Sequence, residues 1–255
     1  MMRAFAAIAL NGFRESIRNR LTVVVAAFAV FLVLFTSVAF QLTVTTLDRT
    51  MTDIGIGFIS LIAQLLAILL SCGLIPLEIN RRTVFFPVSK PVSRTVFFVG
   101  RYFGNLIAIT FVVAMMFVLF VAQFLYLRGT LGLPHLNAML GIIAQVEVIS
   151  AVGIFFSSFT SQFVSAVVTS AMFFIGHMAS EGYALAARAS EVPKAVGLAL
   201  YYLLPNLDRL DLTARASYML PTPASEMAGH LTYAAAYTCV LLAAGSGLFE
   251  RRDFR

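Results

Sequence analysis

The stretch Leu77–Gly104, LEINRRTVFFPVSKPVSRTVFFVGRYFG, separates two long apolar runs. It contains five basic residues, two prolines and a single acid, whereas residues 54–76 and 102–127 on either side contain no charge. About 20 apolar residues form a helix that crosses a hydrocarbon core of about 30 Å. The stretch is therefore predicted to be a polar connection between two membrane-spanning helices.

The composition of the whole chain agrees with this interpretation. Hydrophobic residues make up 60% of the 255 residues and charged residues 12%, about half of the usual charged share of a soluble domain. Six spans are predicted, at Leu21–Phe40, Ile54–Pro76, Tyr102–Leu127, about Asn137–Phe159, about Gln162–Gly182 and about Ala228–Phe249. The predicted fold is an all-α integral membrane protein with a single transmembrane domain over residues 1–255.

Residues 1–20 are predicted to form an amphipathic helix in the membrane interface. Ala6, Leu10, Phe13 and Ile17 recur at helical spacing, and most of the arginines lie off that stripe, an arrangement suited to anionic headgroups. The alternative is a cytoplasmic extension of the first spanning helix. The charged run that follows the short apolar segment argues against a cleavable signal peptide.

Basic residues set the predicted orientation. With the N-terminus in the cytoplasm, 12 of the 18 lysines and arginines lie in cytoplasmic segments, as membrane topology favours. Four of the other six fall in one long loop, residues 183–227. Both termini and residues 77–101 are therefore predicted to be cytoplasmic. The net charge of +6 reflects this bias and does not indicate nucleic-acid binding.

Residues 80–90 are too polar to span, and two prolines limit any helix to short pieces. Apolar side chains stand among the charges, namely Val84, Phe85, Phe86, Val88 and Val92. Such an element suits a groove on a partner protein or a membrane surface. The alternative is a connecting loop whose positive charge only fixes the topology.

Three groups of residues resemble a known family. The order Glu78, Arg82-Thr83, Ser89-Lys90-Pro91-Val92-Ser93-Arg94 and Gly100-Arg101-Tyr102-Phe103-Gly104 is similar to the segment between spans 2 and 3 in type-2 ABC transporter permeases. The ending Glu250-Arg251-Arg252-Asp253-Phe254 and the piece Leu204-Pro205-Asn206-Leu207 are also similar to that family. Arg101 stands where a lysine is more common, and it keeps the charge.

The resemblance implies an ATPase-coupling segment at residues 77–101 and a shorter second contact at residues 157–162. The residues implied in coupling are Glu78, Arg82, Thr83, Phe85, Phe86, Lys90, Pro91, Arg94, Ser158 and Ser161. The implied partners are two copies of a cytoplasmic ABC ATPase, a second copy of this permease or a related one, and accessory periplasmic or membrane proteins. Export across a bacterial cytoplasmic membrane is the implied activity, with residues 183–227 capping the path outside.

The chain has no Gly-x-x-x-x-Gly-Lys-(Ser/Thr) phosphate loop and no hydrolase or cysteine-pair motif. We therefore expect neither catalysis nor a cofactor or metal in this chain; ATP and Mg²⁺ belong to the partner ATPase. Cys72 and Cys239 lie in apolar runs and are interpreted as small apolar residues.

Four polar residues within the spans are candidates for a translocation path: Gln145, Glu147, His177 and Glu181. Charged groups in a bilayer usually face protein or water, so Glu147 either lines the path, forms a neutral hydrogen bond to a neighbouring helix, or reaches an aqueous cleft. His177 and Glu181 are four residues apart and are predicted to share a helix face. They form either a metal or proton-relay pair or an ordinary interfacial pair.

Three classes of function remain open from the sequence. The first is the ABC permease, and the others are a membrane-embedded enzyme and an ATP-independent channel or carrier that would use Glu147, His177 and Glu181. The phenylalanine-rich spans favour an amphipathic or lipidic cargo without identifying it. Within the predicted external loop, Val192–Leu204 is apolar but too short to span, which predicts an interfacial or re-entrant helix.

Overall fold

The computed structural model describes residue 10 and residues 22–42, 47–80, 93–127, 129–188 and 191–250. These residues are helical or in short connections, and none of them is in a strand. The elements are α2 (Thr22–Leu42), α3 (Leu47–Asn80), α4 (Arg94–Tyr126), α5 (Leu133–Ser157), α6 (Gln162–His177), α7 (Ala179–Ala187), α8 (Glu191–Leu203), the 3₁₀ turn η3 (Asp208–Leu210), α9 (Thr213–Ser217) and α10 (Ala224–Glu250).

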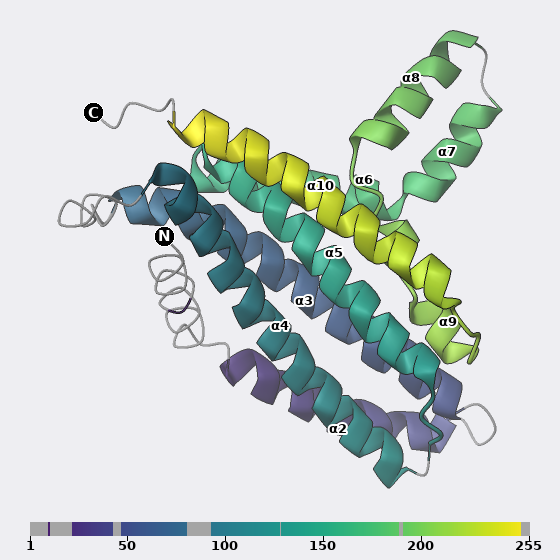
Figure 1. Ribbon diagram of the computed structural model, residues 1–255. Coiled ribbons are helices and arrows are strands. Elements are labelled where there is room, and N and C mark those ends of the chain that lie inside the picture. The colour runs from purple at the N-terminus through teal and green to yellow at the C-terminus, as the bar shows by residue number, and fades with distance from the viewer. Residues whose placement is uncertain are drawn as a thin grey trace.

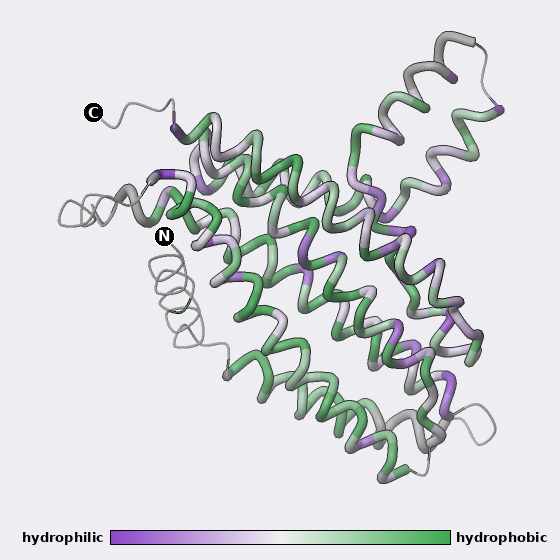
Figure 2. Tube along the Cα trace, in the orientation of Figure 1, coloured by the Kyte–Doolittle hydropathy of each residue, from purple (hydrophilic) through white to green (hydrophobic). Residues whose placement is uncertain are grey.

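Four of these helices are long and apolar enough to cross a membrane: Asp48–Leu77 within α3, and α4, α5 and α10. The pair α6 and α7, bent by 61°, passes the same test as one broken span. Figure 2 shows hydrophobic residues along most of the length of these helices. The prediction of an all-α fold is confirmed for the described residues, and the long apolar helices agree with a multi-pass membrane protein. The count of six spans stays a prediction. The proposed N-terminal interfacial helix lies outside the described residues, apart from Leu10.

Helix α5 lies at the centre of the bundle and contacts α3, α4, α6, α9 and α10. Its closest approach is to α3, where Gly153 faces Ser71. A Cβ added to Gly153 would lie 2.8 Å from the Ser71 Cβ, so the absence of a side chain is what allows the two helices to touch. Small residues at such crossings are typical of membrane helix packing.

Helices α4 and α10 converge at one end of the bundle and diverge toward the other (Figure 1). The rings of Phe98 and Phe249 lie 5.8 Å apart where the two helices meet, and a Cβ at Gly245 would lie 2.9 Å from Phe98. We call this the Glu250 end and the other the Pro134 end. Helix α5 lies between the two diverging helices (Figure 1).

The second span was predicted to end at Pro76, and the apolar part of α3 ends at Leu77, while the helix itself continues through the proline to Asn80. Proline removes one backbone hydrogen bond, and membrane helices tolerate this where neighbours satisfy the freed groups.

Two serines define starts of helices: Ser93 accepts from Val96 N at 3.4 Å to cap α4, and Ser161 accepts from Val164 N at 3.4 Å to cap α6.

Helices α7 and α8 pack on each other as a hairpin that extends away from the bundle (Figure 1). The chain then returns to the bundle through residues 204–212. Leu207 N donates to the Gly176 carbonyl at 3.0 Å, and a Cβ at Gly141 would lie 2.5 Å from the Leu210 carbonyl oxygen. This return segment therefore packs against α6 and α5.

Candidate functional site

Most of the predicted coupling residues lie outside the described part of the chain. These are Arg82, Thr83, Phe85, Phe86, Lys90 and Pro91. Glu78 belongs to the last turn of α3, and Arg94 is the first residue of α4. The structure therefore places the two ends of the predicted segment and leaves its docking surface a prediction.

The start of α4 is bound to the end of α10. Arg94 donates from Nη1 to the Glu250 backbone carbonyl at 3.0 Å, and the Thr95 hydroxyl donates to the Glu250 carboxylate. Glu250 also begins the Arg-Arg-Asp-Phe ending noted in the sequence. These two bonds join α10 to the first residues of α4.

The short connection between α5 and α6 contains the second predicted contact. The Ser158 hydroxyl donates to the Phe155 carbonyl at 2.7 Å, and Ser161 caps α6. Phe155 also lies near α10, because a Cβ at Gly245 would lie 3.5 Å from its ring. Ser158 and Ser161 therefore lie at the Glu250 end, the same end at which α3 stops and α4 begins (Figure 1).

Gln145 lies in a buried polar network between α3 and α5. Its Oε1 accepts from the Ser60 hydroxyl and from Gln64 Nε2, both at 3.1 Å, and Gln64 Nε2 also donates to Ser60 Oγ at 2.8 Å. Its Nε2 donates to the Leu207 carbonyl at 3.1 Å. Because Gln145 is 1% exposed, it acts as a structural link between the return segment and the core.

Glu147 lies on the other side of α5, since two residues along a helix rotate the side chain by about 200°. The residue is partly buried. Its backbone carbonyl accepts from the Tyr102 hydroxyl at 3.0 Å. Among the residues that the structure describes, the Glu147 carboxylate has no hydrogen-bond or ion-pair partner. Gln145 and Glu147, predicted together as path residues, thus face different surroundings.

His177 and Glu181 do not share a continuous helix face as predicted. The helix breaks at Met178, and α6 and α7 meet at 61°. His177 Nδ1 lies 2.9 Å from the Phe173 carbonyl, and the two rings are 4.6 Å apart, while Glu181 is exposed. Spacing alone could not reveal this break, because the sequence around it contains no proline. Among the described residues, no three His, Cys, Asp or Glu side chains form a metal-binding group.

Sequence reasoning missed a polar cluster at the Pro134 end. The Arg49 guanidinium lies 3.8 Å over the Tyr218 ring and donates to its hydroxyl, and the Ser217 hydroxyl donates to Asp53. These contacts hold α9 against the start of α3. The partners are more than 160 residues apart in sequence, so no local pattern connects them.

A second missed contact joins α9 to α10. Arg215 forms a two-pronged ion pair with Glu226, with N–O distances of 2.7 and 2.8 Å. The hydrogen bond to Glu226 raises the pKa of Arg215, so this guanidinium stays charged. Arg215 and Glu226 are 11 residues apart and belong to different helices, so no local sequence pattern predicts that they pair.

No protein-family model matches the chain, and no curated protein matches it.

Proposed function

We propose that the chain is the permease subunit of an ABC transporter and works with a separate cytoplasmic ATPase. The observation that carries the proposal is the ordered set of residues from Glu78 to Gly104, with the matching ending from Glu250. The arrangement of helix ends supports it. The described ends of the first coupling segment, in α3 and α4, lie at the Glu250 end together with the second contact, and basic residues favour the cytoplasmic side there.

The proposed mechanism is alternating access in a pair of such permeases. ATP binding brings two ATPase subunits together and displaces the segment between Asn80 and Arg94. Because Arg94 and Thr95 are bound to Glu250, this displacement moves α4 and α10 together. The two bundles then rotate against each other and release cargo to the outside. We assign the protein to a bacterial cytoplasmic membrane with both termini inside.

Copurification tests this proposal. The tagged full chain is purified in mild detergent, and its partners are identified by mass spectrometry. We expect a stoichiometric phosphate-loop ATPase that is lost when Glu78→Ala, Arg82→Glu and Phe85→Ala are combined. A matched variant at the other end of α4, with Leu125, Tyr126 and Thr130 replaced by alanine, keeps the ATPase. A particle without ATPase, or one that retains it in the first variant, contradicts the proposal.

A further inference from the structure

One face of α5 is not fully covered by other helices, and we call it the open face. Leu133, Leu136, Leu140, Ile143 and Glu147 follow one another at helical spacing on this face. Leu133 is 74% exposed and Leu136 52% exposed, whereas Ile143 and Glu147 are partly buried. The row is apolar except for the carboxylate at its inner end.

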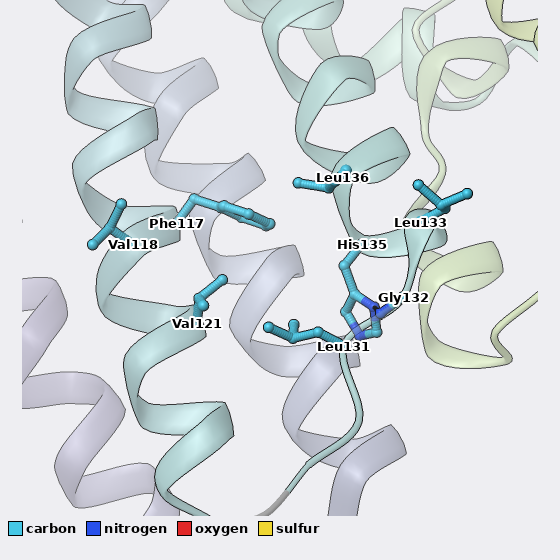
Figure 3. Close-up of a pocket in the computed structure, with 8 residues that line it drawn as sticks. All are labelled: Phe117, Val118, Val121, Leu131, Gly132, Leu133, His135 and Leu136. Carbon is cyan, nitrogen blue, oxygen red and sulfur yellow. Dashed lines mark hydrogen bonds between the residues drawn. The ribbon is translucent and has the colours of Figure 1, made fainter.

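The open face lies between α4 and α10, which meet at the Glu250 end and diverge toward the Pro134 end (Figure 1). At the Pro134 end of this face, a cavity of about 530 Å³ lies between α4 and the start of α5. The side chains of Phe117 and Leu136 point toward each other across this cavity (Figure 3), and Val118, Val121 and Leu131 line it further.

Glu147 is the last residue of the open face that is not fully buried. The position seven residues further along the same face is Ile154, which is 0% exposed and packs in a cluster with Phe98, Tyr102 and Leu242 from α4 and α10. Tyr102 is held to α5 by its hydrogen bond to the Glu147 carbonyl. The carboxylate therefore lies at the buried end of the open face.

Two buried polar residues, one turn from Tyr102 and one turn from Glu147, lack side-chain hydrogen bonds within the described residues. Asn105 lies one turn after Tyr102 on α4 and is 1% exposed, and neither of its side-chain polar atoms has a hydrogen bond among the described residues. Ser150, one turn after Glu147, is also buried, and its hydroxyl has none. Buried polar atoms without partners cost free energy, so this level of the bundle is suited to a polar guest or ordered water.

The chemistry of the open face indicates which kind of molecule would bind there. An isolated carboxylate in a bilayer is costly, and a cation beside it offsets that cost. In the described part of the chain, no basic side chain pairs with Glu147. The leucine and isoleucine row from Leu133 to Ile143 extends for about 15 Å, the rise of 10 helical residues, and offers a surface for hydrocarbon.

We propose that this open face of α5 binds a lipophilic amine, with the cationic nitrogen against the Glu147 carboxylate and the hydrocarbon along Leu136, Leu140 and Ile143. The inference deepens the proposed function, on which it rests, because it names the chemical class of the cargo. Binding itself requires only this chain and a membrane, and therefore can be measured without the ATPase.

The test uses the full chain in nanodiscs of zwitterionic phosphatidylcholine. Two nitroxide-labelled probes of equal chain length are compared, a hexadecyltrimethylammonium and a neutral hexadecanol, and electron paramagnetic resonance gives the immobilised fraction of each. We expect the native chain to bind the cationic probe about tenfold more tightly, the effect of one charge-assisted contact. Glu147→Gln should abolish that preference while keeping the weak binding of both probes.

Two further variants keep the result interpretable. Asp211→Asn removes an exposed acid elsewhere and should retain the preference. Leu140→Trp places a bulky ring on the open face and should weaken the binding of both probes. Equal binding of the two probes to the native chain, or a preference that persists in a folded Glu147→Gln protein, overturns the inference. A failed ATPase copurification would overturn the proposed function and leave this binding result unaffected.

Discussion

The side-chain amide of Gln145 donates a hydrogen bond to the backbone carbonyl of Leu207, across 62 residues of sequence and at a distance of 3.1 Å. Gln145 lies halfway along α5, and Leu207 lies in the segment that returns from the α7–α8 hairpin. This bond therefore fixes a loop segment at the level of the middle of a spanning helix. Loop backbone at that depth needs such protein partners, because lipid offers none.

We predict that Gln145→Leu destabilises the protein by about 2–3 kcal/mol, since the Leu207 carbonyl, Ser60 and Gln64 all lose a buried partner. Unfolding in mixed detergent micelles measures the change. Gln123→Leu is the control, because the Gln123 side chain, on α4, makes no hydrogen bond within the described residues. Equal stability of the two variants would contradict the role assigned to Gln145.

The contact between α3 and α5 predicts opposite effects at two glycines. Gly153→Ala should destabilise by about 1–3 kcal/mol through overpacking against Ser71. Gly247→Ala meets nothing within 4 Å and should be neutral or stabilising by up to about 1 kcal/mol, because alanine favours helix. Thermal unfolding compares the two, and Ser71→Gly should partly rescue Gly153→Ala. A tolerated Gly153→Ala would show that the helices are less close.

The bond between Thr95 and Glu250 predicts a cross-link between α4 and α10. In a chain whose Cys72 and Cys239 have been replaced by alanine, the pair Thr95→Cys and Glu250→Cys should form a disulfide under mild oxidation. The pair Thr95→Cys and Leu248→Cys should not, since Leu248 is exposed on another side of α10. Mobility on non-reducing gels reports the product. Cross-linking of both pairs, or neither, would contradict this arrangement.

The predicted orientation can be tested by labelling single cysteines. Lys194 in α8 and Ser161 before α6 are both exposed. If the Glu250 end is cytoplasmic, an impermeant maleimide added to intact cells should label Lys194→Cys and leave Ser161→Cys unlabelled until the membrane is opened. The reverse pattern would place both coupling segments outside the cell and exclude the proposed ATPase contact.

The spanning helices could be predicted from the sequence because each depends on a local property, the length of an apolar run. The helix starts at Ser93 and Ser161 depend equally on neighbouring residues. The second span was predicted to end at Pro76, close to the end of the apolar part of α3 at Leu77. The break at Met178 was invisible, because the return segment, with Pro205 and Leu207 against Gly176, packs there from a distant part of the chain.

The candidate sites could be predicted only in part, for the same reason. Glu147 stood out as a lone acid in an apolar run, but the sequence could not indicate which neighbours it faces. The partnership of Gln145 with Leu207 and the hold of Arg49 on Tyr218 depend on how distant segments pack. Sequence spacing finds residues that are close along one helix, and these contacts join different elements.

The break at Met178 leaves α6 with 16 residues, a rod of about 24 Å, whereas its neighbours are matched to a hydrocarbon core of about 30 Å. If α6 and α7 form one broken span, lipids beside α6 shorten or tilt to cover its apolar length. The bilayer would then be thinned on one side of the protein only. Two proteins that each thin the bilayer deform less of it when they lie side by side. This side of the protein would therefore favour contact with another membrane protein that has an equally short helix.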